Sequence, residues 1–409
     1  MLNFKSFLTE SKNVHMEHIE ELIFNEGVDG TRKAINFLRD IRDALSGSSN
    51  RTSNITVKWD GAPAIFAGID PKDRKFFVGK KGVFNKNPQV FKTPRDIDND
   101  PKFPNDLKDT FKIALAELKK IGIRDVVQGD LMFGPGDLIT EEIDGQSYTT
   151  FQPNTIVYAI PVNNKLAREM RAAKIGVVFH TLYKGKTLDT MKASFGSKIA
   201  SRLRKSRSVW FDDANYKDQT GLVTFTGTET KNITSILSET GTLFKQTSAQ
   251  VMNDIKNNED LKVRMKTYNN SLIRQGKDIS SNFSVNDLKD SIKTFWQKEI
   301  DKVKTEKSKD TKKQLRDDMI KFIDDNRSEI IKIYRLMGLL SKAKQVIIDK
   351  LNKGSKIKTF LRTAFGFTVT NEEGYVAIDK LSTGAVKLVD RIEFSRANFS
   401  PDVIKGWEK

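Results

Sequence analysis

The sequence predicts an α+β protein, because the residue pattern changes twice along its 409 residues. Residues 51–228 contain short runs of β-branched and aromatic residues separated by turn signals, which is typical of strands. In residues 229–365 glycine and proline are scarce and apolar residues recur at helical spacing, as in Ile330–Leu351. Residues 366–409 return to the strand pattern. We therefore expect antiparallel sheets flanked by helices, an inserted all-α domain, and a helical segment at residues 1–50.

Within the first segment, residues 13–45 show two apolar stripes at helical spacing. Gly27 and Gly30 are expected to form the turn between them. His15 and His18 are three residues apart, so one helical face could carry both imidazoles. A zinc site needs further ligands and none is evident nearby, so the pair alone does not define a metal site.

The composition favours an anionic partner. The chain has 70 Lys and Arg against 53 Asp and Glu, a formal charge of +17; an ordinary soluble basic protein is the alternative. Cysteine is absent, which excludes disulfides and Cys-based zinc sites and is typical of a reducing cytoplasm. No long apolar run is present, so neither secretion nor membrane insertion is expected. We expect a cytoplasmic monomer.

Much of the positive charge lies in the helical region. Residues 231–365 hold 29 Lys and Arg against 17 Asp and Glu, an excess of 12. A basic helical module could hold phosphate backbones without reading their sequence. The alternative is an ordinary helical bundle with a solvated Lys-rich face. Lys302–Lys313 lacks apolar periodicity, and we expect it to be a loop between helices.

A possible nucleophile occurs in Lys58-Trp59-Asp60-Gly61, which lies between predicted strands at 55–57 and 64–67. The tetrapeptide places an amine beside a carboxylate and a turn glycine. Lysine attacks an electrophile only when it is deprotonated, so such a site must lower its pKa by desolvation or nearby positive charge. The same four residues are also typical of an exposed hairpin turn. Other motifs along the chain must therefore distinguish a catalytic lysine from a surface turn.

Five more short segments occur in a definite order after this tetrapeptide. They are Gly79-Lys80-Lys81-Gly82, Gly129-Asp130, the strand containing Phe179, Glu373-Gly374-Tyr375-Val376, and the strand containing Lys387. Together with Lys58-Trp59-Asp60-Gly61, this series resembles the motifs of the covalent nucleotidyltransferase superfamily of ATP-dependent DNA ligases, RNA ligases and capping enzymes. The resemblance covers about residues 55–183 and 367–392, and it implies the nucleotidyltransferase fold.

The resemblance also implies a role for each motif residue. Lys58 would attack the α-phosphorus of ATP and form lysyl–AMP, with Asp60 and Gly61 completing the nucleotide-binding motif. Lys80 and Lys387 would neutralise phosphate charge. The remaining assignments are Glu373 as the ligand of Mg²⁺ (or Mn²⁺), Asp130 as an acceptor for the ribose hydroxyls, and Phe179 as the ring that stacks on adenine.

Three features depart from the family pattern. Asp130 stands where relatives carry Glu, which shortens the side chain by one methylene. Val389 replaces the second lysine of the last motif, and Arg391 is the nearest substitute. Tyr158 competes with Phe179 for the stacking position.

The function implied by the resemblance is that of an ATP-dependent polynucleotide ligase, which transfers AMP to a 5′-phosphate and joins it to a 3′-hydroxyl in DNA or RNA strands. Only about twenty residues come after Lys387, so we expect no C-terminal OB domain. The opening residues resemble those of large tailed-phage proteins, whose compartment would be the host cytoplasm. A capping-type RNA guanylyltransferase and a non-catalytic basic nucleic-acid-binding protein with a degenerate fold remain alternatives.

Overall fold

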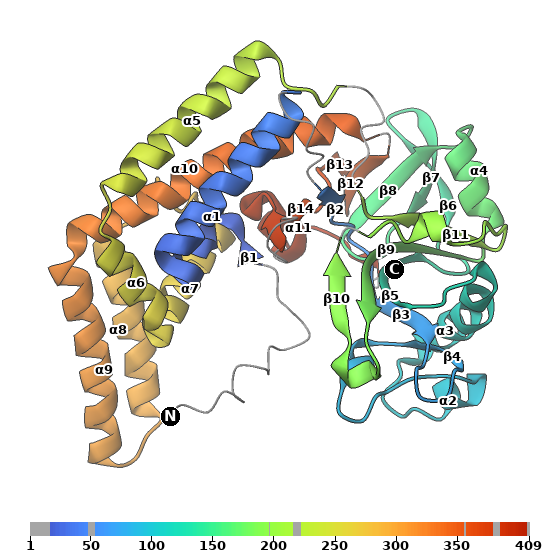
Figure 1. Cartoon of the computed structure of the whole chain (residues 1–409), viewed down its shortest axis with the longest axis horizontal. Coiled ribbons are helices and arrows are strands. Elements are labelled where there is room, and N and C mark those ends of the chain that lie inside the picture. Colours follow the sequence, from blue (N-terminus) through green and yellow to red (C-terminus); the bar gives the residue numbers. More distant parts are fainter. Residues whose placement is uncertain are drawn as a thin grey trace.

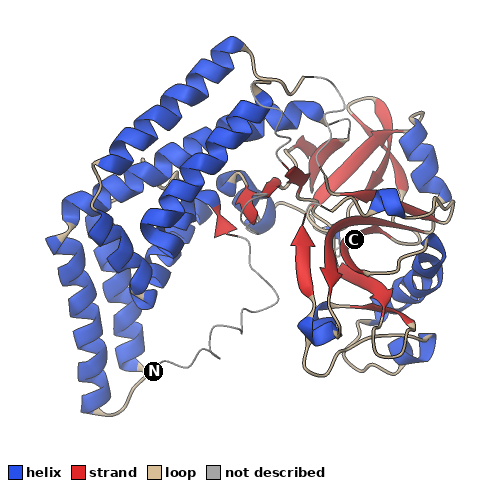
Figure 2. Cartoon of the chain, viewed as in Figure 1, coloured by secondary structure: helices blue, strands red, loops and turns tan. Residues whose placement is uncertain are grey.

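The computed structural model describes residues 17–47, 54–195, 197–215, 222–355, 357–378 and 385–406. A β-rich body built from three sheets adjoins a group of long helices (Figures 1 and 2). Antiparallel strand pairs predominate, with parallel pairs between β1 and β15 and between β11 and β9. The predicted α+β class is confirmed.

The largest sheet has six strands, and its two faces pack in different surroundings. In spatial order its strands are β10 (Lys192–Phe195), β9 (Ile175–Lys184), β5 (Val126–Phe133), β3 (Ala64–Ile69) and β4 (Phe76–Gly79), with β11 (Val209–Asp213) beside the first half of β9. Ile65 and Ala67 belong to a core under helix α3 (Asn105–Leu118), whereas Phe66 packs on the opposite face. Successive side chains of a strand point to opposite faces of the sheet, so β3 contributes to two cores.

A four-stranded sheet joins segments that are far apart in the sequence. Its order is β1 (Glu17–His18), β15 (Ala385–Leu388), β14 (Tyr375–Ile378) and β2 (Asn54–Val57). In Figure 1 the red C-terminal strands therefore lie beside the blue N-terminal ones. His18 lies in β1 and not on a helix, so the expectation of a helical His pair is wrong at this residue. His15 lies outside the described residues.

A five-stranded sheet completes the body. Its order is β13 (Gly366–Val369), β12 (Lys358–Thr363), β8 (Ile156–Pro161), β7 (Gln146–Phe151) and β6 (Ile139–Ile143). β12 pairs with β8, so the chain rejoins the sheets at Lys358, shortly after the long helices end. The smaller helices are η3 (Lys81–Phe84), α2 (Pro94–Asp98), η4 (Lys119–Ile121), α4 (Lys165–Ala172), η5 (Leu188–Thr190), η6 (Ala200–Arg202), η7 (Asn352–Gly354) and α11 (Arg391–Phe399).

The long helices succeed one another from residue 227 to residue 351. They are α5 (Gly227–Lys245), α6 (Ala249–Asn257), α7 (Glu259–Arg274), α8 (Val285–Asp301), α9 (Glu306–Asp325) and α10 (Arg327–Leu351). The helix expected at Ile330–Leu351 is confirmed. The loop expected at Lys302–Lys313 is wrong, because Thr305 caps α9 and the chain is helical from Glu306. Ion pairs three residues apart, such as Lys309 with Glu306, stabilise this stretch without an apolar stripe.

The N-terminal segment packs into the same core as the long helices. It consists of η2 (Ile19–Glu21) and α1 (Leu22–Leu45), and α1 contacts α5, α6 and α10. The expected break is present at Gly27, where φ is 61°. Gly30 instead lies buried within the helix, so the turn does not extend to it. No helix in the described parts of the chain is long and apolar enough to cross a membrane.

Candidate active site where the three sheets meet

Lys58 extends the four-stranded sheet by one residue beyond β2. Its backbone N–H donates to the carbonyl of Gly374 at 2.8 Å. Thr56, Val376 and Lys387 form one row across β2, β14 and β15. Because side chains two residues apart on a strand share a face, Lys58 points to the same side as Thr56 and Lys387. The sheet register thus brings together two lysines that are more than three hundred residues apart.

Glu373 is the direct partner of Lys58. Its Oε1 forms an ion pair with the Lys58 ammonium, and the two side chains are 8% and 28% exposed respectively. Burial raises the pKa of Glu373 to about 7, and the charges of Asp60 and Asp130 add to the rise while Lys58 opposes it. A carboxylate of this kind changes its protonation state near neutral pH.

Lys387 completes the charged group. Burial lowers its pKa, and the positive charge of Lys58 lowers it further, while Glu373 acts in the opposite direction. The electrostatic influence of Lys58 on Lys387 agrees with their common sheet face. The structure therefore brings Lys58, Glu373 and Lys387 into one site.

Gly61 lets the six-stranded sheet approach this group closely. A Cβ at Gly61 would lie 2.5 Å from the Cβ of Asp130 and 2.9 Å from the sulfur of Met132, so a side chain would force β5 away. Gly374 is constrained too: its φ is +143°, and a Cβ there would lie 2.7 Å from the carbonyl oxygen of Leu388. Because neither glycine has a side chain, neighbouring strands can pack closely beside the lysine–carboxylate pair.

Asp60 is engaged by the protein itself. Its carboxylate is buried and accepts hydrogen bonds from Asn154 Nδ2 at 2.6 Å, Thr155 N at 2.6 Å and Ile156 N at 2.7 Å. Its own N–H donates to the Tyr158 hydroxyl at 2.7 Å. Since Ile156 begins β8, these bonds fasten the five-stranded sheet to the segment that carries Lys58. The sequence suggested a nucleotide contact, and the structure places Asp60 as the joint between sheets.

The structure does not bring Phe179 into the group. Phe179 is 1% exposed and belongs to the core under α3, on the face of the sheet opposite Asp130. A register shift between Gln128 and Gly129 in β5 accompanies this placement. The next residue of β9, His180, faces the site instead: its Nε2 lies 3.8 Å from Asp130 Oδ2, and its side chain is 25% exposed.

Two other expected residues already have partners within the protein. Tyr158 is 1% exposed and stacks on Phe151, so its ring is already covered on that face. Lys80 Nζ lies 4.0 Å from the centroid of the Phe103 ring, which belongs to the core under α3. His180 was missed by sequence reasoning, although strand alternation beside Phe179 offered a signal for it.

The metal prediction rests on Glu373 alone. No group of three or more His, Cys, Asp or Glu suited to a metal ion occurs among the residues that can be described. Mg²⁺ commonly uses one or two carboxylates with waters and substrate phosphates, so one partly accessible carboxylate is compatible with an ion that arrives with a nucleotide.

A second carboxylate lies behind the site. Burial raises the pKa of Glu372 to about 7, and its Oε2 has no hydrogen-bond partner in the part of the chain that is described. Glu372 lines a cavity of about 420 Å³ between the five-stranded sheet and the end of α10. Ionised Glu372 therefore destabilises the folded protein, because a buried charge lacks full compensation next to Glu373.

These features define an α+β protein with a lysine–carboxylate pair at the junction of three sheets. The chain belongs to a family of unknown function, DUF6267, whose model matches residues 13–402. No curated protein and no solved structure matches it significantly.

Proposed function

We propose that this chain is an ATP-dependent polynucleotide ligase that acts through a lysyl–AMP intermediate on Lys58. The observation that carries the proposal is the ion pair between Lys58 and Glu373, with Lys387 on the same sheet face. A lysine held this way, 28% exposed, beside a buried carboxylate and a second cation, suits attack on a phosphate. The order of these residues agrees with the nucleotidyltransferase motifs, and the fold assignment to that superfamily is part of the same proposal.

The first step would use the pair directly. Lys58 must lose a proton before its Nζ attacks the α-phosphorus of ATP, forming the N–P bond while pyrophosphate leaves. Glu373 contacts the ammonium, and its pKa of about 7 suits it to accept that proton near neutrality. Lys387 would neutralise charge on the phosphate oxygens. Only the ionised form of Glu373 could hold Mg²⁺ together with phosphate oxygens, so the ion would bind there after this proton has passed to solvent, and it would supply further charge neutralisation.

The burial of Phe179 favours another ring for the proposed base stacking. Phe179 is buried in the core under α3, whereas His180 presents its imidazole near Asp130 at the site. We assign the stacking role to His180, and the ribose contact to Asp130. Asp60 would act indirectly, by holding β8 against the Lys58 segment.

Labelling with α-³²P-nucleotide tests the proposal. With Mg²⁺, label from ATP should stay on the protein through denaturing electrophoresis, and Lys58→Arg should abolish it, because arginine can keep the ion pair but does not deprotonate. Lys342→Arg, at an exposed lysine of α10 outside the motifs, is the matched control and should label like the parent.

Each other outcome has a clear meaning. Label from GTP in place of ATP would favour the capping-type guanylyltransferase. Absence of label from both nucleotides would favour the non-catalytic nucleic-acid-binding protein. Undiminished label in Lys58→Arg would overturn the role of Lys58.

A further inference from the structure

Residues 184–207 form a long, strongly basic stretch of the β-rich body. This stretch holds eight basic residues against a single acid, Asp189. All eight are exposed: Lys184, Lys186, Lys192, Lys198, Arg202, Arg204, Lys205 and Arg207. Like charges at this density repel one another, so their accumulation calls for an anionic partner.

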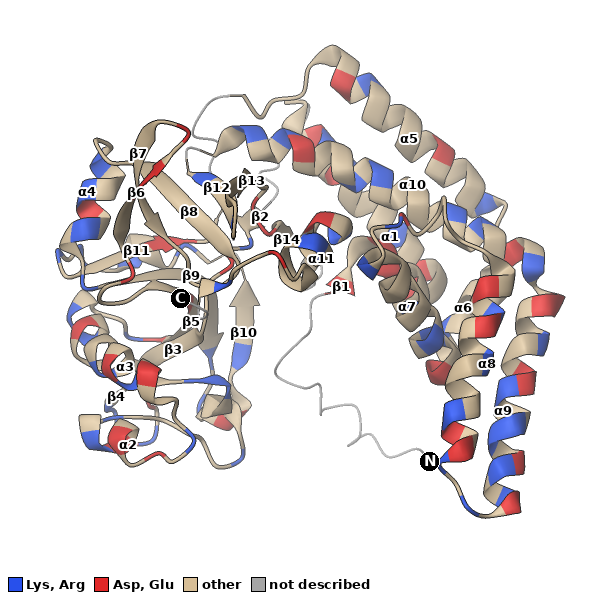
Figure 3. Cartoon of the chain, turned by 180° about the vertical axis from the view of Figure 1, so that it is seen from behind, with Lys and Arg blue, Asp and Glu red and all other residues tan. Residues whose placement is uncertain are grey.

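Within the described residues these cations have no carboxylate partner, unlike several lysines of the long helices. None of the eight forms an ion pair with any residue that the structure describes. In the helical region, by contrast, Lys302 pairs with Glu299 at 2.5 Å and Lys313 with Asp310 at 3.0 Å. Figure 3 shows the resulting mixture of blue and red along α8 and α9. Several lysines of the helices are therefore paired locally although the region keeps a positive excess, whereas the cations of residues 184–207 are not paired within the described residues.

The eight residues line the outer edge of the six-stranded sheet. Lys192 pairs with Lys184 at the far end of β9, and Phe195 pairs with Thr181 near its middle. The chain then runs through η6 to β11, which pairs with the first half of β9. Because β9 has ten residues, this edge spans about 33 Å. We call residues 184–207 the basic edge.

We propose that the basic edge is the surface on which the phosphate backbone of the nucleic-acid substrate docks. The inference rests on the proposed function for the choice of partner. The edge belongs to the same sheet as Asp130 and His180, with β9 shared between them. A strand held along it would lie on the sheet that carries part of the candidate active site.

The residues between the cations favour nucleic acid over a membrane or a protein. Exposed hydroxyls at Thr187, Thr190, Ser194 and Ser201 keep the segment between the cations polar, although they already bond to neighbouring residues of the segment. None of the large exposed apolar side chains in the described ranges falls within residues 184–207. Membrane-binding segments and protein interfaces both use apolar or aromatic anchors, which this edge does not offer.

Protection of a sheet edge explains only a small part of this charge. Lysine on an edge strand discourages pairing with another chain, and Lys192 on β10 suits that purpose. The other cations lie outside the β10 strand, at the end of β9, in turns and in the segment that leads to β11. A docking surface accounts for all of them.

The test compares two triple variants that lower the net charge equally. Lys186→Gln, Lys192→Gln and Lys198→Gln alter the basic edge. Lys302→Gln, Lys309→Gln and Lys313→Gln alter ion-paired lysines of the helices. Binding of fluorescent nicked DNA and of a DNA–RNA duplex is measured by anisotropy in EDTA without ATP, over a range of salt concentrations. Self-adenylylation is measured separately.

The edge variant should bind both duplexes at least about tenfold more weakly, and its salt slope should be smaller by about 3 if all three lysines contact phosphates. The helix variant should bind within about twofold of the parent, and both should adenylylate normally. Parental binding by the edge variant, or an equal loss in the helix variant, would overturn the inference. If no protein adenylylates, the ligase proposal fails while the binding comparison still decides the role of the edge.

Discussion

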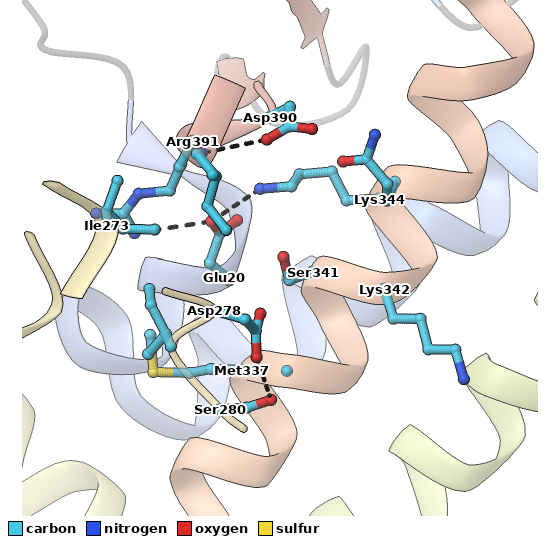
Figure 4. Close-up of a pocket in the computed structure, with 14 residues that line it drawn as sticks. Glu20, Ile273, Asp278, Ser280, Met337, Ser341, Lys342, Lys344, Asp390 and Arg391 are labelled. Carbon is cyan, nitrogen blue, oxygen red and sulfur yellow. Dashed lines mark hydrogen bonds and ion pairs between the residues drawn. The ribbon is translucent and has the colours of Figure 1, made fainter. Parts of the chain in front are cut away.

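Lys344 Nζ lies 2.8 Å from Glu20 Oε1, and both side chains are only 2% exposed (Figure 4). The pair joins η2 to α10, and Arg391 at the start of α11 lies 3.7 Å from the same oxygen. Burial by itself would raise the pKa of Glu20, but Lys344 and the other nearby positive charges lower it to about 2. Three distant parts of the sequence therefore meet at one buried ion cluster, beside a cavity of about 440 Å³.

Removing Lys344 should be severely destabilising. Lys344→Met leaves Glu20 buried without its main partner, and we expect a loss of about 3–5 kcal/mol in the free energy of unfolding in urea at neutral pH. Lys342→Met, at an exposed residue of the same helix, should change it by less than about 0.5 kcal/mol. Because the folded pKa of Glu20 is lowered, its contribution is present above pH 4.5 and is lost as pH falls toward 2. Equal stability of the two variants would contradict this role of the cluster.

Asp60→Asn should weaken the junction between the sheets. Thr155 N and Ile156 N both donate to Oδ2, which the amide oxygen can replace, so the new NH₂ group would face the Asn154 Nδ2 donor that now bonds to Oδ1. We expect a loss of about 2–3 kcal/mol, because a charge-assisted acceptor is removed in a buried place. Asp109→Asn, at a side chain that is 89% exposed, is the control. Parental unfolding of Asp60→Asn would show that these bonds contribute little.

Gly61→Ala should cost stability because the added Cβ would meet Asp130 at 2.5 Å. The backbone must shift to relieve this contact, at a cost of about 1–3 kcal/mol. Gly227→Ala is a matched control, since nothing lies within 4 Å of its added Cβ. Thermal unfolding of both variants measures the difference, and an unchanged midpoint for Gly61→Ala would refute the close packing of Gly61 against β5.

Glu373 predicts a pH dependence for the proposed reaction. If its carboxylate accepts the proton of Lys58, self-adenylylation should rise with pH and level off above about 7, where Glu373 is ionised. Glu373→Gln keeps the shape but cannot accept the proton, so the residual rate should be lower by about 10²–10⁴-fold and lose this rising limb. A rate profile of the same shape in Glu373→Gln would exclude this role.

Glu372 provides a test that needs no activity. Its folded pKa of about 7 exceeds the ordinary 4.5, so its contribution to stability is greatest below pH 4.5 and falls as pH rises through 7. Glu372→Gln should therefore stabilise the protein by up to about 3 kcal/mol at alkaline pH and by little in mild acid. Urea unfolding of both proteins at an alkaline pH and at a mildly acidic pH measures the difference in stability. A constant difference between the two proteins would show that Glu372 is not the titrating group.

The sequence alone determined the α+β class and most of the elements near the site. The strands near Lys58, Asp130 and Lys387 follow from runs of β-branched and apolar residues, and α10 follows from apolar residues at helical spacing. Both patterns are local, so the sequence is enough to predict these elements. The order of the motifs along the chain also predicts that Lys58 and Glu373 belong to one site. The first half of α9 was not predicted, because it is stabilised by a cap and local ion pairs and lacks an apolar stripe.

Only the tertiary structure decided which side chains face the site. Phe179 and His180 are adjacent, and the irregular register between β5 and β9 helps to decide which of them lies in the core. Asp60 connects two sheets because its carboxylate accepts a hydrogen bond from Ile156, the first residue of β8, which is 96 residues away in the sequence. The carboxylate partners of charged residues can also be distant in the sequence. The net charge of the chain therefore does not show which cations are unpaired, and the basic edge could not be predicted from it. Burial and register depend on segments distant in the chain, which no local pattern records.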